Sequence, residues 1–389
     1  NPSHVSSRLY ICWRFAANDC PGAEIPILVD TASCECYITV QFLKGKEKNV
    51  RNDGMKADSL PKLEETPELR ERLLPYCRLK LGEVWEDPQG THKVGCLDAA
   101  NPDHVSLLMG DHSSQLAIHD PPYNLVTFEE RILEEYVNWC EQWIRLTGRH
   151  LTSDASMYVW LGADQTNGFQ PLPDFMIMMR KIAELKPRSF ITMRNQRGYG
   201  TQKNWMAVRQ ELLYYVKGNP FFQVQYTDIP KILRGYYKVV DGKVTENLER
   251  SKSEFIRPGN VWVDIQQVFY RMEENVSLCY AQKPLKAIER IISASSQEKD
   301  LVVDFFAHSG TTLLACERLQ RQCYTLDIDP IYCELAIRRL ERFRKLGRLG
   351  WQNKYPFEEV AAFGDKQKIN ERSNHRLGTE NGIAQEVLF

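Results

Sequence analysis

A carboxylate, two prolines and an aromatic ring stand together at residues 120–123, Asp-Pro-Pro-Tyr. The prolines restrict the backbone of this loop, and the Pro121 carbonyl meets no N–H from the proline that follows it. The Asp120 carboxylate and that carbonyl could accept both hydrogens of an exocyclic amine and turn its lone pair towards an electrophile. The Tyr123 ring could stack on the base that carries the amine. The pattern favours chemistry on a planar amine, and the alternative is a stiffened strand exit with a surface tyrosine.

A second group of residues predicts a nucleotide site. The apolar run Leu301–Asp304 is typical of a buried parallel strand, and Ser309-Gly310 then turns the chain into a segment with helical character. A further short strand delivers Asp327 seventeen residues after Gly310. An acidic residue at this distance suits the ribose hydroxyls of an adenosine held at the first turn.

The elements that must position these residues alternate between strand and helix. This alternation predicts an α/β fold with a doubly wound, mostly parallel sheet, in which ligands bind beyond the carboxyl ends of the strands. The predicted strands are 115–119, 157–161, 189–193, 211–216, 301–304 and 323–326, and the predicted helices are 60–81, 128–146, 174–185, 285–293 and 332–346.

The composition is that of a globular protein of 389 residues, 43% hydrophobic and 26% charged. No apolar run approaches the roughly 18 residues that a membrane span needs, so no membrane partner is expected. Eleven cysteines, odd in number and scattered, suit free thiols in a reducing cytoplasm. Cys12, Cys20, Cys34 and Cys36 lack the spacing of zinc knuckles, so buried free thiols are favoured over a metal site.

The charge is distributed unevenly along the chain. Residues 188–260 hold 13 Lys and Arg against 6 Asp and Glu, although the net charge of the whole chain is −1. Such a basic segment indicates a polyanionic partner, with a solvated charged face as the alternative. Within it, Asp241-Gly242 is a two-residue hairpin signal between strand-like stretches, which we interpret as part of an inserted module.

Three motifs together resemble a known family. Asp120–Tyr123 resembles the catalytic tetrapeptide of the S-adenosylmethionine-dependent DNA amino-methyltransferases, which act on N6 of adenine or N4 of cytosine. Residues 304–312, DFFAHSGTT, resemble their cofactor loop, and Gln282-Lys-Pro284 resembles the segment beside the methionine end of the cofactor. The order of the motifs is that of the β group. The resemblance covers residues 94–346 and implies a Rossmann-like class I methyltransferase fold.

The resemblance also implies roles for individual residues. Asp120, Pro121 and Pro122 would form the catalytic loop, with Tyr123 stacked on a flipped-out base. Asp at position 120, rather than Ser, favours adenine over cytosine. The residues implied to bind S-adenosyl-L-methionine are Asp304, Phe306, Ala307, Ser309, Gly310, Thr311, Thr312, Asp327, Lys283 and Pro284. We expect the DNA-facing residues to be Arg194, Arg197, Tyr199, Lys203, Lys231, Arg234 and Lys238.

Two positions depart from the family pattern: the family usually has Pro where Phe305 stands and Gly where His308 stands. A His308 side chain would crowd the cofactor unless the backbone avoids positive φ. A cytosine-5 enzyme is set aside because the chain contains no Pro-Cys dipeptide, which makes Glu274-Asn-Val276 a coincidental match to that class.

The expected product is N6-methyladenine in double-stranded DNA, with N4-methylcytosine as the first alternative. RNA or a free base as substrate, and a catalytically silent DNA-binding subunit of a restriction-modification complex, are further alternatives. A cognate restriction endonuclease and a homodimer stay open as partners.

The expected division of the chain follows the motif order. An N-terminal extension or small accessory domain is followed by the catalytic half, a target-recognition insertion, the cofactor-binding half and a partly disordered tail. The ranges are 1–90, 91–218, 219–262, 263–346 and 347–389.

Overall fold

The computed structural model describes residues 67–122, 132–162, 169–199, 205–230, 237–246, 253–279, 281–352 and 354–357. The chain divides into two compact units, residues 1–57 and 58–389, and every described residue lies in the second. Among the helices of the described ranges, none is both long and apolar enough to span a bilayer. The four cysteines considered as zinc ligands and the predicted N-terminal extension up to residue 66 lie outside the described residues.

A nine-stranded sheet forms the centre of the second unit, in the order β1-β2-β11-β10-β3-β4-β6-β5-β9. The five strands from β2 to β4 in this order are parallel, β6 runs antiparallel to both of its neighbours, and β1 is antiparallel to β2. The bounds are β1 Glu83–Glu86, β2 His92–Cys96, β3 Ser114–His119, β4 Leu151–Leu161, β5 Lys186–Tyr199, β6 Ala207–Lys217, β9 Val261–Trp262, β10 Leu301–Asp304 and β11 Gln322–Asp327.

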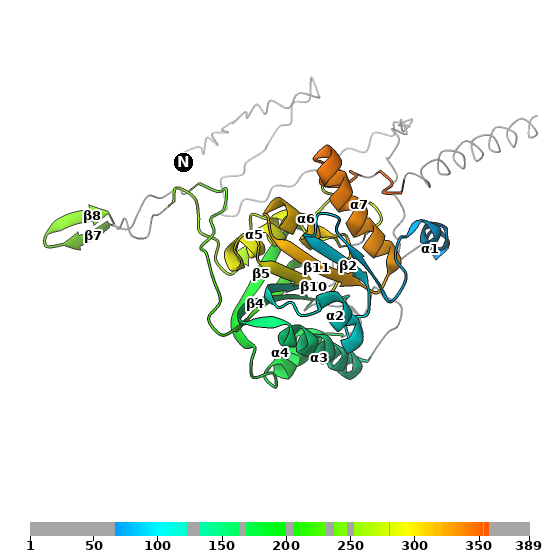
Figure 1. The fold of residues 1–389 in the computed structure, drawn as a ribbon. Coiled ribbons are helices and arrows are strands. Elements are labelled where there is room, and N and C mark those ends of the chain that lie inside the picture. The colour runs from blue at the N-terminus through cyan, green and yellow to red at the C-terminus, as the bar shows by residue number, and fades with distance from the viewer. Residues whose placement is uncertain are drawn as a thin grey trace, which may run out of the picture. The chain divides into compact units, whose positions relative to one another are not determined.

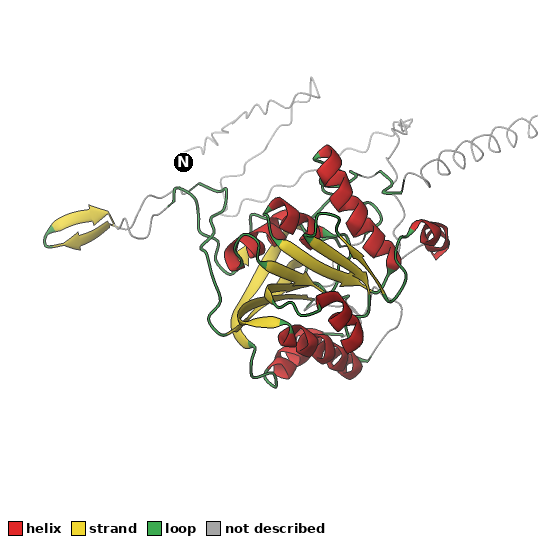
Figure 2. Ribbon diagram, in the orientation of Figure 1, coloured by secondary structure: helices red, strands yellow, loops and turns green. Residues whose placement is uncertain are grey.

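Helices cover both faces of this sheet (Figures 1 and 2). One face carries α5 (Leu285–Ser295), α6 (Thr311–Arg318) and α7 (Pro330–Leu346), and the other carries α2 (Pro102–Met109), α3 (Leu133–Arg149) and α4 (Pro171–Met179). A further helix of the described ranges, α1 (Pro67–Leu73), continues into a 3₁₀ turn at Leu74–Tyr76. The result is the three-layered, doubly wound Rossmann-like architecture that the alternation of elements predicts.

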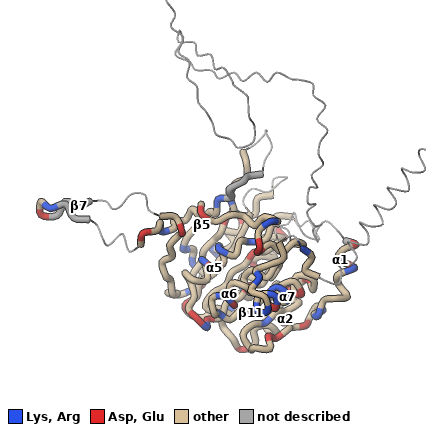
Figure 3. Tube along the Cα trace, turned by 90° about the horizontal axis from the view of Figure 1, so that it is seen from above, with Lys and Arg blue, Asp and Glu red and all other residues tan. Residues whose placement is uncertain are grey.

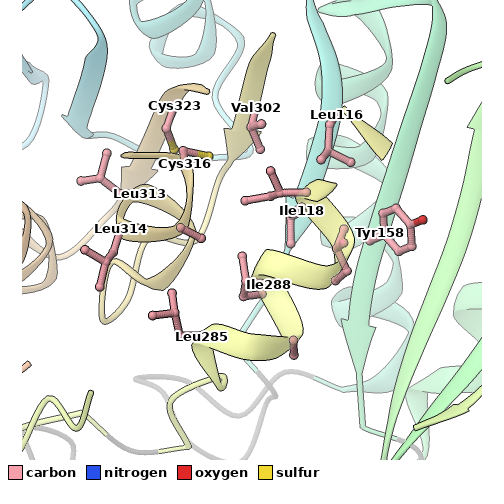
Figure 4. Packing of buried hydrophobic residues seen from close by; sticks show 14 of the residues in the cluster. Leu116, Ile118, Tyr158, Leu285, Ile288, Val302, Leu313, Leu314, Cys316 and Cys323 are labelled. Carbon is pink, nitrogen blue, oxygen red and sulfur yellow. The ribbon is translucent and has the colours of Figure 1, made fainter. Parts of the chain in front are cut away.

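Alternation along the buried strands builds two separate cores. In β10, Val302 packs on the face of α5–α7, whereas Leu301 and Val303 pack on the face of α2–α4. Figure 4 shows Val302 beside Leu116 and Ile118 of β3 in the first of these cores. Because parallel strands in the middle of such a sheet are buried on both faces, they appear in the sequence as continuous apolar runs.

The strand order places the two predicted loops side by side. β10 and β3 are neighbouring parallel strands, with Val302 opposite Leu116 and Val303 opposite Ala117. From β10 the chain passes through α6 to β11, and from β3 it passes through α3, on the opposite face, to β4. The chain therefore diverges at this pair of strands, which is where open α/β sheets form a ligand crevice. Asp120 and Asp304 lie at its two sides.

Several boundaries differ from those expected. Of the helix predicted at 60–81, residues 60–66 lie outside the described residues, and α1 ends at Leu73 because Pro75 provides no N–H to continue an α-helix. The helix predicted at 174–185 is α4, which starts earlier because Pro171 and Pro173 are tolerated in a first turn, and which ends at Met179. The sheet begins at Glu83, ahead of the expected domain boundary at residue 90.

Two segments outside the main motifs are also defined. Trp351 and Phe357, beyond the expected end of the cofactor-binding half at residue 346, are buried in a third apolar cluster with Leu73 and Ile331.

The predicted hairpin is confirmed as β7 (Tyr237–Val240) and β8 (Lys243–Glu246), which pair with each other. Asp241 and Gly242 have φ of 53° and 75°, as the tight turn requires.

Candidate active site

The predicted catalytic loop begins at Asp120, directly after His119, the last residue of β3. Pro121 is buried, and the Pro122 carbonyl accepts a hydrogen bond from the Tyr136 hydroxyl at 3.2 Å. Tyr136 is itself buried on α3, so the loop is anchored to the helix layer next to it. Tyr123, the predicted stacking residue, lies outside the described residues.

An ion pair that the sequence did not predict occupies the Asp120 carboxylate. Lys283 Nζ lies 2.7 Å from both oxygens of Asp120, and the Lys283 side chain is only 6% exposed. The same ammonium lies 5.3 Å from the centre of the Trp160 ring on β4, within range of a cation–π interaction. Lys283 was expected on the cofactor side alone, and the structure places it against the carboxylate that was predicted to be catalytic.

His119 connects the catalytic loop to the cofactor loop. Its Nδ1 accepts the backbone N–H of Phe305 at 3.2 Å, and its Nε2 lies 3.1 Å from Thr147 Oγ1, which donates in turn to the Trp143 carbonyl. This network assigns the proton to Nε2. Burial lowers the pKa of His119 to about 3, so the ring is neutral at physiological pH. A proline at position 305, as the family usually has, would lack this N–H donor.

Asp304 ends β10 inside the core. Its carboxylate accepts from Thr312 Oγ1 at 2.6 Å and from the Phe306 N–H at 3.0 Å, and the residue is 4% exposed. Burial, together with the nearby charges of Asp120 and Asp327, raises the pKa of Asp304, and the two hydrogen bonds lower it; the net result is a pKa of about 8. The carboxyl group is therefore protonated over much of the neutral range.

The cofactor loop follows a left-handed path at His308. Its φ is 43°, in the region that a glycine adopts without strain. The expectation that the backbone avoids positive φ at this position is therefore wrong. The side chain lies against α7, with the ring centroids of His308 and Tyr332 4.8 Å apart. The His308 N–H donates to Asp327 Oδ2 at 2.9 Å, and the Ala307 N–H donates to the Leu326 carbonyl at 2.8 Å. The loop is thus fixed to the end of β11.

Gly310 allows helix α7 to pack directly on the loop. Its φ is 68°, and a Cβ at this position would lie 2.7 Å from Ala336 Cα. Below it, the fully buried Arg339 donates to the Ser309 carbonyl at 2.8 Å and to Thr311 Oγ1 at 3.0 Å. Arg339 lies in the last predicted helix, and nothing in its sequence pattern distinguished it from a surface arginine.

Asp327 ends β11 beside the loop. Its Oδ1 accepts the Asp329 N–H at 3.0 Å, and its Oδ2 accepts from His308. Burial and the charge of Asp329 raise its pKa to about 6. Each carboxylate oxygen keeps a second lone pair, which is the acceptor capacity that a pair of ribose hydroxyls needs.

The segment before α5 is held by the stretch that resembles a cytosine-5 motif. Gln282 Oε1 accepts the Val276 N–H, and its Nε2 donates to the Glu274 carbonyl, both at 2.8 Å. The Glu274 carboxylate accepts the Leu285 N–H at 2.8 Å, directly after Pro284, the N-cap residue of α5. Residues 274–276 therefore have a structural role here, consistent with a coincidental match to that motif.

A small cavity of about 20 Å³ lies between the two loops, lined by Asp120, Trp160, Lys283, Asp304, Phe306, Ala307, Ser309, Thr311 and Thr312 among others. This volume is that of about one water molecule, so a nucleotide enters only if side chains move. A larger cavity of about 580 Å³ lies elsewhere, between α5 and the strands β4, β6, β5 and β9.

Of the residues expected to face DNA, the structure places the side chain of Arg194 only. Its side chain is exposed in β5, two residues beyond Thr192. Thr192 pairs with Glu211 of β6, and Glu211 pairs on its other side with Leu161, at the carboxyl end of β4. Arg194 is therefore on the same edge of the sheet as Asp120. Arg197 and Tyr199 belong to β5 and Lys238 to β7, but their side chains lie outside the described residues, as do Lys203, Lys231 and Arg234 entirely.

Comparison with known proteins decides the family. Residues 114–338, more than half of the chain, match the family of N6/N4 methyltransferases described as DNA methylase. The chain is a member of this amino-methyltransferase family. Type II methyltransferase M.HpaI of Haemophilus parainfluenzae is 28% identical over 240 residues, 59% of this chain and 69% of that protein. The DNA adenine methyltransferase YhdJ of Escherichia coli is 27% identical over 242 residues, 59% of this chain and 76% of that one.

Solved structures of similar proteins align with 64% of this amino-methyltransferase. The PvuII DNA methyltransferase, titled cytosine-N4-specific, has a TM-score of 0.47 and 16% identity over 64% of this chain and 85% of its own. The M1.HpyAVI–SAM complex has a TM-score of 0.43 and 17% identity over 64% of this chain and 100% of its own.

The cofactor of these amino-methyltransferases is S-adenosyl-L-methionine, and the residues present fit it chemically. Asp327 offers acceptors at the end of the second strand, and Gly310 leads into the N-terminus of α6, whose dipole favours an anionic group. When bound, the cofactor supplies an electrophilic methyl group on a sulfonium. The assignment of individual residues to the cofactor stays a prediction, and the small cavity requires side chains to move before the cofactor binds.

Proposed function

We propose that this amino-methyltransferase methylates the exocyclic N6 of adenine in double-stranded DNA. The observation that carries the proposal is that the Asp120 loop and the Asp304 loop follow neighbouring parallel strands at one edge of the sheet. Adenine is favoured over cytosine by the carboxylate at position 120, and the E. coli relative is named as an adenine enzyme. Methylation of cytosine N4 is the alternative, because the same loop would bind either amine.

In this mechanism Asp120 and the Pro121 carbonyl accept the two amine hydrogens. The lone pair of the nitrogen is thereby directed away from the ring and towards the cofactor side of the crevice. The new C–N bond would form as the methyl C–S bond of the sulfonium breaks and S-adenosylhomocysteine leaves, and Asp120 would accept the proton that the nitrogen then loses. Pro122 holds the loop through Tyr136, and Tyr123 would stack on the base. Neutral His119 orients the loop and takes no proton.

On the cofactor side, Asp327 would bind the ribose and Gly310 would allow close approach of the chain. Ser309, Thr311 and Thr312 would surround the methionine end at the start of α6. Phe306 and Ala307 line the cavity, and Lys283 with Pro284 would complete it. Arg194, together with the basic residues of the 197–238 segment, would contact the phosphates of a duplex from which the target base is extruded.

The proposal is tested by long-read sequencing of DNA from a methylation-deficient host that expresses the chain, followed by nucleoside analysis of the same DNA. We expect N6-methyladenine at one short sequence, and none in the Asp120→Ala variant. Asp120→Asn separates the charge of the side chain from its size, because the amide has nearly the same shape as the carboxylate. If the charge is needed, this variant should have a kcat lower by roughly 100-fold or more. N4-methylcytosine at the site would transfer the proposal to the alternative product.

A catalytically silent DNA-binding subunit is the competing function, favoured by the left-handed His308 and the small cavity. Titration calorimetry with S-adenosylmethionine separates the two. Binding that is lost in Asp327→Ala supports the enzyme, whereas no heat of binding in the intact chain supports the silent subunit.

A further inference from the structure

Lys283 stands between the two halves of the site. Its ammonium contacts both oxygens of Asp120, and its own carbonyl accepts a hydrogen bond from Thr311 Oγ1 at 3.4 Å in the first turn of α6. Its side chain also lines the cavity next to the cofactor loop. The residue thus touches the group that must bind the amine and the element that must bind the cofactor.

The ion pair competes with the proposed role of Asp120. With Nζ at 2.7 Å from Oδ1 and Oδ2, the ammonium takes one acceptor site on each oxygen and places a positive charge beside the hydrogens of any amine that binds the others. Removing one partner of a buried ion pair is costly, because the other charge is left uncompensated. Lys283 therefore has to exchange Asp120 for another anion rather than simply leave it.

The backbone of Lys283 is held by its two neighbours in the chain, so an exchange of anions would involve its side chain alone. Gln282 is bound to the 274–276 segment through two hydrogen bonds, and Leu285 is bound to the Glu274 carboxylate. S-adenosyl-L-methionine, the cofactor of this family, carries such an anion in its amino-acid carboxylate. The start of α6 favours an anion and contacts Lys283 through Thr311, so a carboxylate bound there would lie close to this lysine.

We propose that Lys283 is a positioning residue that holds Asp120 in the ligand-free protein and releases it to the target amine when the cofactor carboxylate binds. The inference rests on the proposed function and adds an order to it: the cofactor binds first and the base second. It also accounts for the small cavity, because the ion pair closes the site until the exchange takes place.

The exchange is first tested without DNA, through Trp160. Because the ammonium lies 5.3 Å from this ring, its departure changes the indole emission. S-adenosylhomocysteine keeps the amino-acid carboxylate, and 5′-methylthioadenosine lacks it. We expect a change in tryptophan fluorescence with the first compound and none with the second. The change should disappear in Trp160→Phe, which identifies its source, and in Lys283→Met.

The second test measures the coupling between the two sites. With a duplex carrying the methylated sequence, S-adenosylhomocysteine should tighten DNA binding about 10-fold in the intact protein and less than about 2-fold in Lys283→Met. Lys283→Arg keeps the charge and should retain most of the coupling. 5′-Methylthioadenosine should give almost none.

The outcomes separate this inference from the proposed function. If Lys283→Met keeps the full coupling, or 5′-methylthioadenosine produces it equally well, Lys283 does not perform the exchange although the enzyme methylates DNA. If the protein binds S-adenosylhomocysteine with no change at Trp160, the exchange is also excluded. Absence of any cofactor binding in calorimetry overturns the proposed function itself.

Discussion

Asp304 shows what a single buried carboxyl group contributes to this site. It is nearly inaccessible to solvent, and burial raises its pKa to about 8 in spite of hydrogen bonds from Thr312 and Phe306. In the unfolded chain the same group ionises near 3.8. Between these two values the unfolded state releases a proton that the folded state keeps. Stability is therefore lost as the pH rises through this window, and the loss levels off above about pH 8.

Asp304→Asn tests this at the residue scale. The amide is a neutral isostere of the protonated acid, so the free energy of unfolding of the variant, relative to the intact protein, should rise by roughly a few kcal/mol from pH 4 to pH 8. Urea denaturation across this range is the measurement. The same comparison with Asp327→Asn should level off near pH 6, since burial raises the pKa of that carboxyl only to about 6. A difference that does not vary with pH would refute the assignment.

At the scale of elements, the cofactor loop depends on the packing of α7 against it. Gly310 has positive φ and almost touches Ala336, while Arg339 on the same helix binds the Ser309 carbonyl. Helix α7 therefore fixes the path of the loop at Ser309 and Gly310, and α6 begins at the next residue, Thr311. Packing of this kind explains why a glycine is required before α6 in terms of both φ and space.

Gly310→Ala should destabilise the protein by about 2–4 kcal/mol, because it combines a left-handed alanine with a steric clash. Ala336→Gly removes the clashing Cβ but leaves the positive φ and the close Cα. We therefore expect the double variant Gly310→Ala, Ala336→Gly to recover part of the loss in thermal unfolding, and Ala336→Gly alone to cost about 1 kcal/mol. Strictly additive losses would show that the two residues are not coupled.

Local patterns explain which elements could be predicted. Leu301–Val303 is apolar at every position because β10 is buried on both faces, and Asp241-Gly242 occurs where only a two-residue turn fits. The antiparallel direction of β6 was not predictable, because the apolar run at 211–216 has the same pattern in either direction. The Lys283–Asp120 pair joins residues 163 positions apart, and no local pattern specifies such a contact.

At the scale of the whole molecule, the charge pattern suggests where DNA binds. Figure 3 shows Lys and Arg interspersed with Asp and Glu over the described core, in keeping with a net charge of −1. The excess of basic residues falls in 188–260, the segment that contains β5, β6 and the β7–β8 hairpin. Arg194 places the start of this segment at the catalytic edge of the sheet. Phosphate binding is therefore expected from this segment rather than from the core in general.

Replacing Lys231, Arg234 and Lys238 together by alanine should weaken DNA binding and reduce the slope of log K against log salt by about 2–3. Fluorescence anisotropy at several salt concentrations measures both. The control replaces three exposed lysines outside the segment, Lys80, Lys181 and Lys299, and should leave the slope unchanged. If the triple variant of Lys231, Arg234 and Lys238 has the same slope as the intact protein, these residues do not contact DNA phosphates.

The hydrogen bond from the Phe305 N–H to His119 carries a consequence for how such enzymes diverge. A proline at position 305 would leave the buried Nδ1 of His119 without a hydrogen-bond donor. An aliphatic residue at position 119 would leave the buried N–H of residue 305 without an acceptor. Neither substitution is tolerated easily without the other, so the two sites should be inherited as a pair. Related chains with proline at the position of Phe305, directly after the aspartate that corresponds to Asp304, should therefore have a residue other than histidine at the position of His119.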